Sequence, residues 1–532
     1  MRILGIEGTA WAASAALYDT ETDDLRMETD AYRPDSGGIH PREAAEHMHE
    51  AVPAVIESVL APDEPVDAVA FSRGPGLGPC LRIVGTAARA LAQARDVPLV
   101  GVNHMVAHLE IGRHQSGFDA PVCLNASGAN AHVLAFHDGR YRVLGETMDT
   151  GVGNALDKFS RHVGWSHPGG PKVEAAAAEG GYLDLPYVVK GMDFSFAGIT
   201  SAAKAAVDDG EPVEDVCCGL QETVFAMLCE VTERALSLTD RDEVVLGGGV
   251  GQNARLRAML GDMCADRGAS FFAPEPRFLR DNAAMIAVLG AKMLAADDTL
   301  AISASRVDPD FRPDAVPVTW RADDEPRATP EAATGTVRGA EATVTLDPDA
   351  VVKRRLPKTY RHPALDERLR RERTAAEARL THEARRVGVP TPVIRDLDPA
   401  EGTIVFEPVG DRDLGRRATT DRVAAVARHL ARLHGADIVH GDPTTRNVRV
   451  GPDRITLIDF GLGYHSADVE DFAMDLHVFE QSLAGTAADV GTLVRAAESA
   501  YRAAGDPAVL DRLREIEGRG RYGGEQAVPD AA

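Results

Sequence analysis

Lysine is scarce in this chain of 532 residues, since only seven of its 57 basic residues are lysine. The 82 acidic residues are spread over the whole length and give a formal net charge of −25 at pH 7. Such a surface is tolerated where salt at ~1 M shortens the Debye length to about 3 Å. We interpret the composition as that of a protein from a salt-loaded cytoplasm, with an ordinary acidic mesophilic protein as the alternative. A net negative charge ordinarily argues against a nucleic-acid partner, because phosphate binding relies on basic residues. In a salt-loaded cytoplasm the charge says little about such a partner.

Cysteine and long apolar runs are also rare. All six cysteines lie in the first half and form no C-x-x-C pair, so neither a zinc knuckle nor a disulfide framework is indicated. No run of about 18 apolar residues is present, and the N-terminus shows neither a charged leader nor a cleavage site. We therefore expect buried cysteines in a cytoplasmic protein without a membrane partner.

The chain is longer than one hydrophobic core usually serves, so we expect two or three domains. Residues 1–320 alternate strand-like and helix-like segments, which is typical of an α/β fold. Strands are expected at residues 2–6, 12–18, 68–72, 122–126, 133–137 and 243–246, and helices at 42–60, 85–94, 216–238 and 282–296. Two similar halves suit a duplicated nucleotide-binding domain. The polar residues 321–336 are expected to be a linker.

Residues 337–522 are expected to form a second, smaller α+β domain, followed by a tail at 523–532. Strands at 339–346 and 350–354, a long charged helix at 365–387 and a strand at 403–408 follow the order of a small kinase N-lobe. The lower lobe, from about residue 422, is short, and no Ala-Pro-Glu triplet follows Asp459. We therefore expect a normal activation segment to be missing.

The second domain carries a kinase-like nucleotide motif. His440-Gly441-Asp442 is followed by Asn447 and then by Asp459 in an Asp-Phe-Gly triplet, which is how kinases place a catalytic base and two magnesium ligands. Asp442 is therefore the candidate catalytic residue. The usual arginine between the histidine and the aspartate, which reads a phosphorylated activation loop, is absent and agrees with the missing segment.

Upstream residues complete a candidate ATP site. Lys353 lies on a strand after the turn that begins at Gly339, where a phosphate-binding lysine is expected. A solvated strand lysine is the alternative, which the scarcity of lysine weakens. Glu377 on the long helix is spaced to pair with Lys353, and Glu383 is a poorer choice.

The first domain contains a candidate metal site and several glycine-rich turns. His104 and His108 stand at i and i+4, so on a helix they share one face and can bind one metal, although two such histidines are more often structural. A metallopeptidase would need a glutamate between them, and Met105 follows His104 instead. Five glycine-rich turns suggest a bound nucleotide, and none is a P-loop.

Several motifs together carry a family resemblance: Ile6-Glu7-Gly8-Thr9-Ala10, the turn at 73–82, His104-x3-His108, Ser127-Gly128-x-Asn130, Asp157-Lys158, His167-Pro168-Gly169-Gly170-Pro171-Lys172-x-Glu174 and the run at 281–287. Residues 1–320 resemble the catalytic threonylcarbamoyl-transferase subunit of the KEOPS complex. The resemblance implies a duplicated actin-like ATPase (ASKHA) fold. It also implies transfer of a threonylcarbamoyl group from threonylcarbamoyl-AMP to N6 of the adenosine 3′ of the anticodon, in tRNAs that read codons beginning with A.

The resemblance also implies the site residues. Iron (Fe²⁺) or zinc (Zn²⁺) would be held by His104, His108 and Asp281. Many members have a ligating tyrosine where this chain has Asn125, whose amide oxygen is a candidate ligand. The threonylcarbamoyl-adenylate would be bound by Asn125, Ala126, Ser127, Gly128, Ala129, Asp157, Gly170, Glu174 and Asn253. His132 is expected to be structural.

Residues 335–522 resemble the small atypical kinase/ATPase of the same complex, including the closing Arg519-Gly520-Arg521. This implies that Gly339, Lys353, Glu377, Asn447 and Asp459 bind ATP and Mg²⁺. The chain departs from the family pattern at Pro443 and Arg446, which flank Asp442.

Together the resemblances predict a natural fusion: a bifunctional tRNA-modification protein of archaeal, halophilic type. The second half would be an ATPase, with Ser/Thr protein phosphorylation also open. The expected partners are tRNA, a small dimerising KEOPS subunit and a kinase-activating subunit. Candidate tRNA contacts are Arg368, Arg370, Arg371 and Arg373, or Arg416 and Arg417.

Two other functions are alternatives to this prediction. One is a signalling Ser/Thr kinase with an inactive ASKHA scaffold, which the intact His104, His108, Asp281 and Asn253 disfavour. The other is a metallopeptidase, which lacks its glutamate base.

Overall fold

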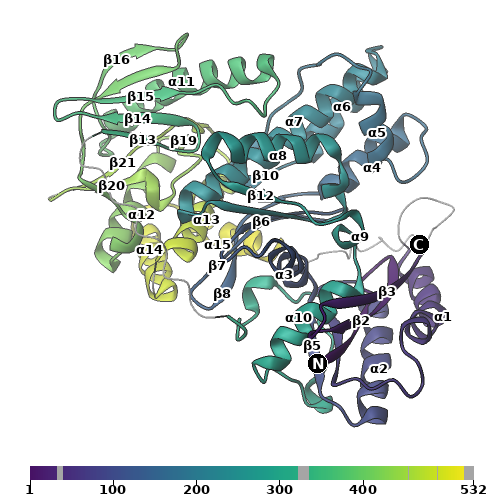
Figure 1. Ribbon diagram of the computed structural model, residues 1–532. Helices are drawn as coiled ribbons and strands as arrows, with labels where there is room; N and C mark the ends of the chain where they lie inside the picture. The colour runs from purple at the N-terminus through teal and green to yellow at the C-terminus, as the bar shows by residue number, and fades with distance from the viewer. Residues whose placement is uncertain (33–39, 322–334, 453, 488, 520–532) are drawn as a thin grey trace, which may run out of the picture.

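The computed structural model describes residues 1–32, 40–321, 335–452, 454–487 and 489–519. Figure 1 shows the N-terminal sheet with its helices below, a second α/β unit above it, and the C-terminal half against the side of that second unit. The tail at 523–532 and residues 322–334 of the expected linker lie outside the described residues.

The first sheet has the order β3-β2-β1-β4-β5, with β1–β3 antiparallel and β1, β4 and β5 parallel. Helices α1 and α2 cover one face, while α3 and α10 cover the other, which gives two buried apolar layers. The elements are β1 (Arg2–Glu7), β2 (Ala12–Asp19), β3 (Asp24–Ala31), β4 (Ala68–Gly74), β5 (Leu99–Asn103), α1 (Pro41–Val59), α2 (Gly78–Arg95), α3 (His104–Ser116) and α10 (Ala283–Ala295).

The second sheet repeats this order. Read from its other edge it is β8-β7-β6-β11-β12, so its first three strands again form an antiparallel meander and its fourth and fifth join in parallel. The strands are β6 (Val122–Ala126), β7 (Ala131–His137), β8 (Arg140–Glu146), β11 (Glu243–Gly247) and β12 (Ser270–Phe272). The matching strand orders confirm the predicted duplicated ASKHA fold.

Helices and short elements complete the first domain. They are α4 (Val152–His162), α5 (Gly170–Ala177), β9 (Val189–Lys190), β10 (Asp193–Phe194), α6 (Ala197–Asp208), α7 (Val213–Thr239), α8 (Ala254–Arg267), α9 (Pro276–Leu279) and the 3₁₀ turns η1 (Gly249–Gln252), η2 (Ile302–Ala304) and η3 (Pro313–Ala315). The expected helices were located correctly, but the one predicted at 85–94 begins earlier, at Gly78.

The C-terminal half begins with a five-stranded antiparallel sheet of order β13-β14-β15-β17-β16. Its elements are β13 (Gly335–Arg338), β14 (Ala342–Leu346), β15 (Val351–Arg355), α11 (Pro363–Arg386), β16 (Ile394–Asp398) and β17 (Thr403–Phe406). The predicted strand at 339–346 is wrong at its start, because residues 339–341 form the turn between β13 and β14. Strand β13 also takes residues 335 and 336, which we expected in the linker.

The lower lobe is mainly helical and has its own apolar core. It contains β18 (Arg412–Asp413), η4 (Gly415–Arg417), α12 (Thr420–His434), β19 (Ile438–Val439), η5 (Thr445–Asn447), β20 (Val448–Val450), β21 (Ile455–Leu457), β22 (Tyr464–His465), α13 (Val469–Thr486), α14 (Val490–Ala504) and α15 (Pro507–Arg519). Helix α13 begins ten residues after Asp459, which leaves no room for a normal activation segment. The predicted minimal kinase-like fold is therefore confirmed.

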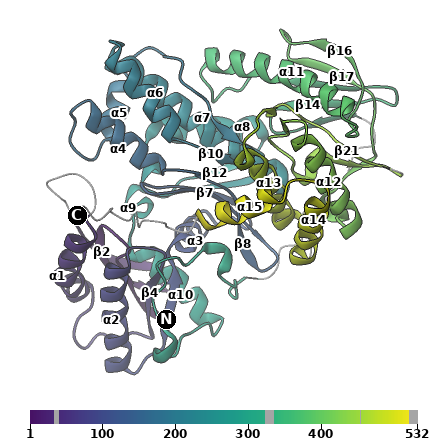
Figure 2. The same ribbon diagram turned by 180° about the vertical axis from the view of Figure 1, so that it is seen from behind.

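Helix α7 belongs to the cores of both halves. Its residues from Val216 to Leu238 are buried almost all round, because one face packs in the first domain and another packs on the C-terminal half. Tyr360, Leu365 and Leu369 of the second half join the same apolar cluster. Helix α13 contacts β7 and β8 of the first domain, and α15 packs against α13 (Figure 2).

Five of the six cysteines are buried, Cys218 is partly buried, and all are unpaired. Among the described helices, none is both long and apolar enough to span a bilayer.

Candidate functional site

The two histidines of the candidate metal site lie at the start of α3. Asn103 caps this helix by accepting hydrogen bonds from Met105 N (3.0 Å) and Val106 N (3.1 Å), which fixes the first turn. Asp281 comes from the segment before α10, and its Oδ1 lies 3.3 Å from Nε2 of both His104 and His108. The three ligand atoms lie within 4.8 Å of one another, so the structure brings together residues 173 positions apart.

Glu7 at the end of β1 orients His104. Its Oε2 lies 3.2 Å from His104 Nδ1, and its Oε1 accepts a hydrogen bond from Thr9 N (2.9 Å). Burial lowers the pKa of His104, but the Glu7 and Asp281 carboxylates outweigh it and raise that pKa to about 10. Glu7 therefore directs Nε2 of His104 toward Asp281, which is the usual role of a second carboxylate beside a metal-ligating histidine.

The donor set fits a transition-metal ion, since two imidazole nitrogens and one carboxylate oxygen are typical ligands of iron and zinc. Asn125, near the end of β6, has its Nδ2 3.6 Å from Sδ of Met105, the residue after His104, and its Oδ1 is buried without a hydrogen-bond partner among the described residues. His132, opposite Asn125 on β7, has its Nε2 3.4 Å from Glu146 Oε2 and so faces a different carboxylate.

The turn after β6 forms one wall of the candidate adenylate site. Ser127 Oγ donates to Asn130 O (3.0 Å) and Ser127 N also donates to Asn130 O (2.9 Å), which closes the turn around Gly128 and Ala129. This turn packs on the N-terminus of α4. A Cβ at Gly151 would lie 2.2 Å from Ala129 C and 2.4 Å from Gly128 O, so only glycine permits this approach.

The other candidate adenylate residues continue the wall. Asp157 Oδ1 accepts a hydrogen bond from Gly169 N (2.6 Å), and Glu174 Oε1 accepts one from Ala254 N (2.7 Å). Asn253 caps α8 and donates from Nδ2 to Gln221 Oε1 (3.1 Å). A Cβ at Gly170 would meet nothing within 4 Å, so the backbone is open there for a ligand.

In the C-terminal half, the structure brings Lys353, Glu377 and Asp459 together. Lys353 Nζ lies 2.8 Å from Glu377 Oε1 and 2.7 Å from Asp459 Oδ1. Arg355, two residues further along β15, adds a second cation, with Nη1 2.7 Å from Glu377 Oε2. A Cβ at Gly461 would lie 2.1 Å from Arg355 Nη2, so the glycine makes room for this guanidinium. Glu383 pairs with His465 instead (2.7 Å).

The loop that carries Asp442 is held by α13. Asp475 accepts hydrogen bonds from His440 N (2.7 Å) and Gly441 N (2.8 Å). Asn447 Nδ2 donates to Asp442 Oδ2 (2.9 Å), which fixes the side chain of the candidate base. The sequence assigns no role to Asp475, Glu7 or Arg355. Asp475 and Glu7 act on residues far away along the chain, and Arg355 is not part of the kinase-like motif.

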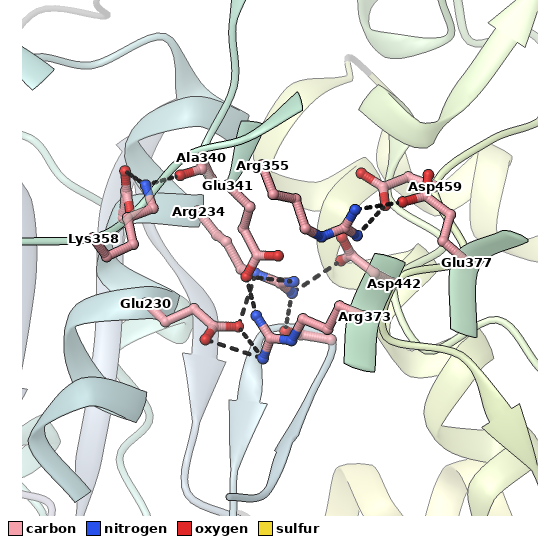
Figure 3. A network of polar contacts seen from close by, with 12 residues as sticks. Glu230, Arg234, Ala340, Glu341, Arg355, Lys358, Arg373, Glu377, Asp442 and Asp459 are labelled. Atoms are coloured by element: carbon pink, nitrogen blue, oxygen red, sulfur yellow. Dashed lines mark hydrogen bonds and ion pairs between the residues drawn. The ribbon is translucent and has the colours of Figure 1, made fainter. Parts of the chain in front are cut away.

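Asp442 faces the first half of the chain. Its Oδ1 has no hydrogen-bond partner among the described residues and lies 3.6 Å from Nη1 of Arg234 on α7 (Figure 3). Burial raises the pKa of Asp442 to about 7, with Arg234 opposing and Asp459 adding to the rise. Nothing in the sequence singles out Arg234, because α7 carries other charged residues, among them Glu230 and Glu233.

Further ion pairs join the two halves around α7. Glu230 lies 2.7 Å from Arg361 Nη2 and 3.1 Å from Arg373 Nη2, and Glu233 lies 2.6 Å from Lys358 Nζ. Arg373 also pairs with Glu341, whose pKa it holds well below its usual range together with Arg234, despite the opposing effect of burial.

These contacts remove most of the expected tRNA patch on α11. Arg373 is buried, so its assignment to an RNA-binding surface was wrong. Arg368 pairs with Asp184 (3.0 Å) and Arg370 with Asp366 (2.8 Å), whereas Arg371 stays exposed.

The fold and the two clusters define a class: an actin-like domain with a candidate metal-ligand triad and a candidate adenylate site, joined to a minimal kinase-like domain. The TsaD family model, described as tRNA N6-adenosine threonylcarbamoyltransferase, matches residues 25–288. A probable bifunctional tRNA threonylcarbamoyladenosine biosynthesis protein of Halobacterium salinarum is 70% identical over 526 residues, covering 98% of this chain and 99% of that protein. A protein of the same description in Methanospirillum hungatei is 52% identical over 526 residues, with the same coverage.

The chain therefore belongs to the family of bifunctional tRNA threonylcarbamoyladenosine biosynthesis proteins, which confirms the resemblance seen in the sequence. The T. kodakarensis HypF structure is similar with a TM-score of 0.40 and 15% identity, over 55% of this chain and 47% of that one. At that level the similarity carries no functional argument.

Proposed function

We propose that the first half transfers a threonylcarbamoyl group from threonylcarbamoyl-AMP to N6 of the adenosine 3′ of the anticodon in tRNAs that read ANN codons. The observation that carries this proposal is the position of Asn125. Asn125 Nδ2 lies 3.6 Å from Sδ of Met105, the residue after His104, and Asn125 stands two residues before Ser127 of the candidate adenylate turn, so the end of β6 would serve both sites. Family membership supplies the substrate class.

The reaction needs an activated carbamoyl carbon and a stabilised leaving group. The adenosine N6 forms a bond to that carbon, the bond from the carbon to the phosphate oxygen of AMP breaks, and N6 loses a proton. Fe²⁺ or Zn²⁺ held by His104, His108 and Asp281 would supply Lewis acidity for the carbamoyl or phosphate oxygens. The 127–130 turn, Asp157, Gly170, Glu174 and Asn253 would hold and orient the adenylate.

Replacing Gly151 with alanine tests the adenylate turn. The new Cβ would push the 127–130 turn away from α4, and overpacking of this kind costs about 1–3 kcal/mol, so affinity for AMP should fall by about 10- to 100-fold. Titration calorimetry with AMP measures the change. Gly198→Ala on α6 is the control, because a Cβ there meets nothing within 4 Å. Unchanged AMP affinity in Gly151→Ala would place the adenylate elsewhere.

We propose that the second half hydrolyses ATP, with Mg²⁺ held by Asn447 and Asp459 and with Asp442 as the base. The carrying observation is Arg234, which lies 3.6 Å from Asp442 Oδ1, in front of the oxygen that a protein hydroxyl would have to reach. A water molecule needs less room beside Asp442 Oδ1 than a serine or threonine side chain does. This favours ATP hydrolysis over Ser/Thr protein phosphorylation, and release of labelled phosphate without labelled protein is the expected result.

The pH profile of ATP hydrolysis follows from the environment of Asp442. Because burial raises its pKa to about 7 and a base acts as the carboxylate, kcat/KM should be flat above about pH 7 and fall roughly tenfold per unit below it. The measurement uses saturating magnesium, so that protonation of free ATP does not contribute to the pH profile. A profile that stays flat well below neutrality would exclude Asp442 as the base.

We also propose tRNA, a small dimerising KEOPS subunit and a kinase-activating subunit as partners. Co-purification of the full chain with each candidate subunit tests this directly.

A further inference from the structure

Arg234 is a buried cation of the first domain that lies inside the candidate ATP site of the second. Its Nη1 is 3.6 Å from Asp442 Oδ1 and its Nη2 is 3.9 Å from Glu341 Oε1, so it sits between the catalytic loop and the turn before β14. Figure 3 shows it between Glu230 on one side and Asp442 on the other. Catalytic loop, magnesium ligand and glycine turn are the parts that surround the γ-phosphate in kinase-like enzymes.

The guanidinium of Arg234 makes few hydrogen bonds. It has five N–H donors. In the part of the chain that the structure describes, it donates one hydrogen bond, from Nη1 to Gly191 O (2.7 Å), whereas its buried Nε makes no hydrogen bond and lies 3.5 Å from Glu230 Oε1. Asp442 Oδ1, which faces Arg234, and Arg355 Nε are also buried and make no hydrogen bond with the described residues. Buried polar atoms are nearly always paired in a complete structure, so this cluster points to a ligand rich in oxygen acceptors.

Other cations of the second half are already engaged. Arg446, the one arginine between His440 and Asn447, pairs with Asp413 (2.9 Å) and with Asp240 at the end of α7. Lys353 is held by Glu377 and Asp459. Arg234 faces Asp442, and its contacts with Glu230, Glu341 and Asp442 are ion pairs of 3.5–3.9 Å that are longer than hydrogen bonds. Although its burial opposes ionisation, Asp442, Glu230 and Glu341 keep its pKa raised, so it stays charged.

We infer that Arg234 is a catalytic residue of the ATPase half, supplied by the transferase half, and that it stabilises the negative charge on the γ-phosphoryl group. The inference rests on the proposed ATP hydrolysis. A water oxygen forms a bond to the γ-phosphorus, the bond from that phosphorus to the β,γ-bridging oxygen breaks, and the water proton passes to Asp442 Oδ1. ADP and phosphate leave, and the N–H groups of Arg234 donate to the equatorial γ-oxygens as charge spreads over them.

The test measures ATP hydrolysis by the full chain carrying Arg234→Met, which keeps the length of the side chain and removes its charge. The rate constant kcat should fall by about 10³-fold, with KM and ADP affinity changed little. The wild type should bind ADP with aluminium fluoride, a mimic of the transition state, more tightly than ADP alone, and the variant should lose that gain. Guanidinium ion added to Arg234→Ala should restore part of the rate.

Lys190→Met is the matched control, because Lys190 pairs with Asp471 across the same interface (2.5 Å) but away from the phosphate site. It should keep the wild-type kcat. Arg234→Lys, which retains a charge, guards against misfolding of the methionine variant and should keep a measurable fraction of the rate. Wild-type kcat in Arg234→Met, or a rate above it, would overturn the inference and leave the proposed ATPase standing. A wild-type chain that hydrolyses no ATP would overturn both.

Discussion

Replacing His108 with alanine is expected to reduce single-turnover threonylcarbamoyl transfer by about 10³-fold. The change removes one of the three donors that meet within 4.8 Å, and a Lewis acid contributes several kcal/mol, each 1.36 kcal/mol being a factor of ten. The measurement combines unmodified tRNA, threonylcarbamoyl-AMP and the required partner subunits, and counts modified adenosine. The metal content of the purified variant, measured by mass spectrometry, should fall in parallel.

His114 provides the control for His108. It lies on the same helix but pairs with the exposed Asp23, 3.0 Å away, outside the metal-ligand cluster. His114→Ala should therefore transfer at the wild-type rate and keep its metal. Full transfer activity in His108→Ala would remove the metal site from the mechanism, whereas loss of metal with retained transfer would limit the ion to a structural role.

Asp442→Asn is expected to lower kcat for ATP hydrolysis by about 10²- to 10⁴-fold, which is the usual contribution of a general base. The amide keeps the shape of the side chain and its contact with Asn447 but accepts no proton. Release of phosphate from radiolabelled ATP gives the rate. In the same preparation, single-turnover transfer from threonylcarbamoyl-AMP should stay within about twofold of wild type, because the metal-ligand cluster and the adenylate wall are built without Asp442.

Asp411→Asn is the matched change for Asp442→Asn, since Asp411 is an exposed carboxylate of the same lobe whose side chain lies 3.6 Å from Arg412. It should hydrolyse ATP normally. Equal rates in Asp442→Asn and wild type would reduce the second half to a scaffold. Loss of transfer together with hydrolysis would instead show that the two reactions are obligatorily linked.

Local patterns in the sequence predicted the parts of the sites that depend on spacing. His104 and His108 share one helix face because they are four residues apart, and Lys353 meets Glu377 because a strand and the following helix are adjacent in the fold. Asp281 could be joined to the histidines only by family resemblance, since nothing local marks an aspartate 173 positions away as a ligand.

Contacts between the halves could not be predicted in this way. Arg234 and Asp442 are brought together by the docking of two domains, and each has neighbours in sequence that give no sign of the other. The same docking buries Arg373, which reads in the sequence as part of a solvated basic helix face. Strand β13 could not be predicted for a similar reason. Its position depends on pairing with β14, and its own residues are exposed and show no clear alternation of apolar and polar side chains.

Helix α7 carries one residue of each candidate nucleotide site. Gln221 near its start holds Asn253 of the adenylate wall, and Arg234, 13 residues later, faces Asp442. At a rise of 1.5 Å per residue the two side chains are spaced ~20 Å apart along the axis, and an intact backbone ladder resists stretching. If α7 slides along its axis, Gln221 and Arg234 are therefore displaced by the same distance. Any such movement acts on both candidate sites at once.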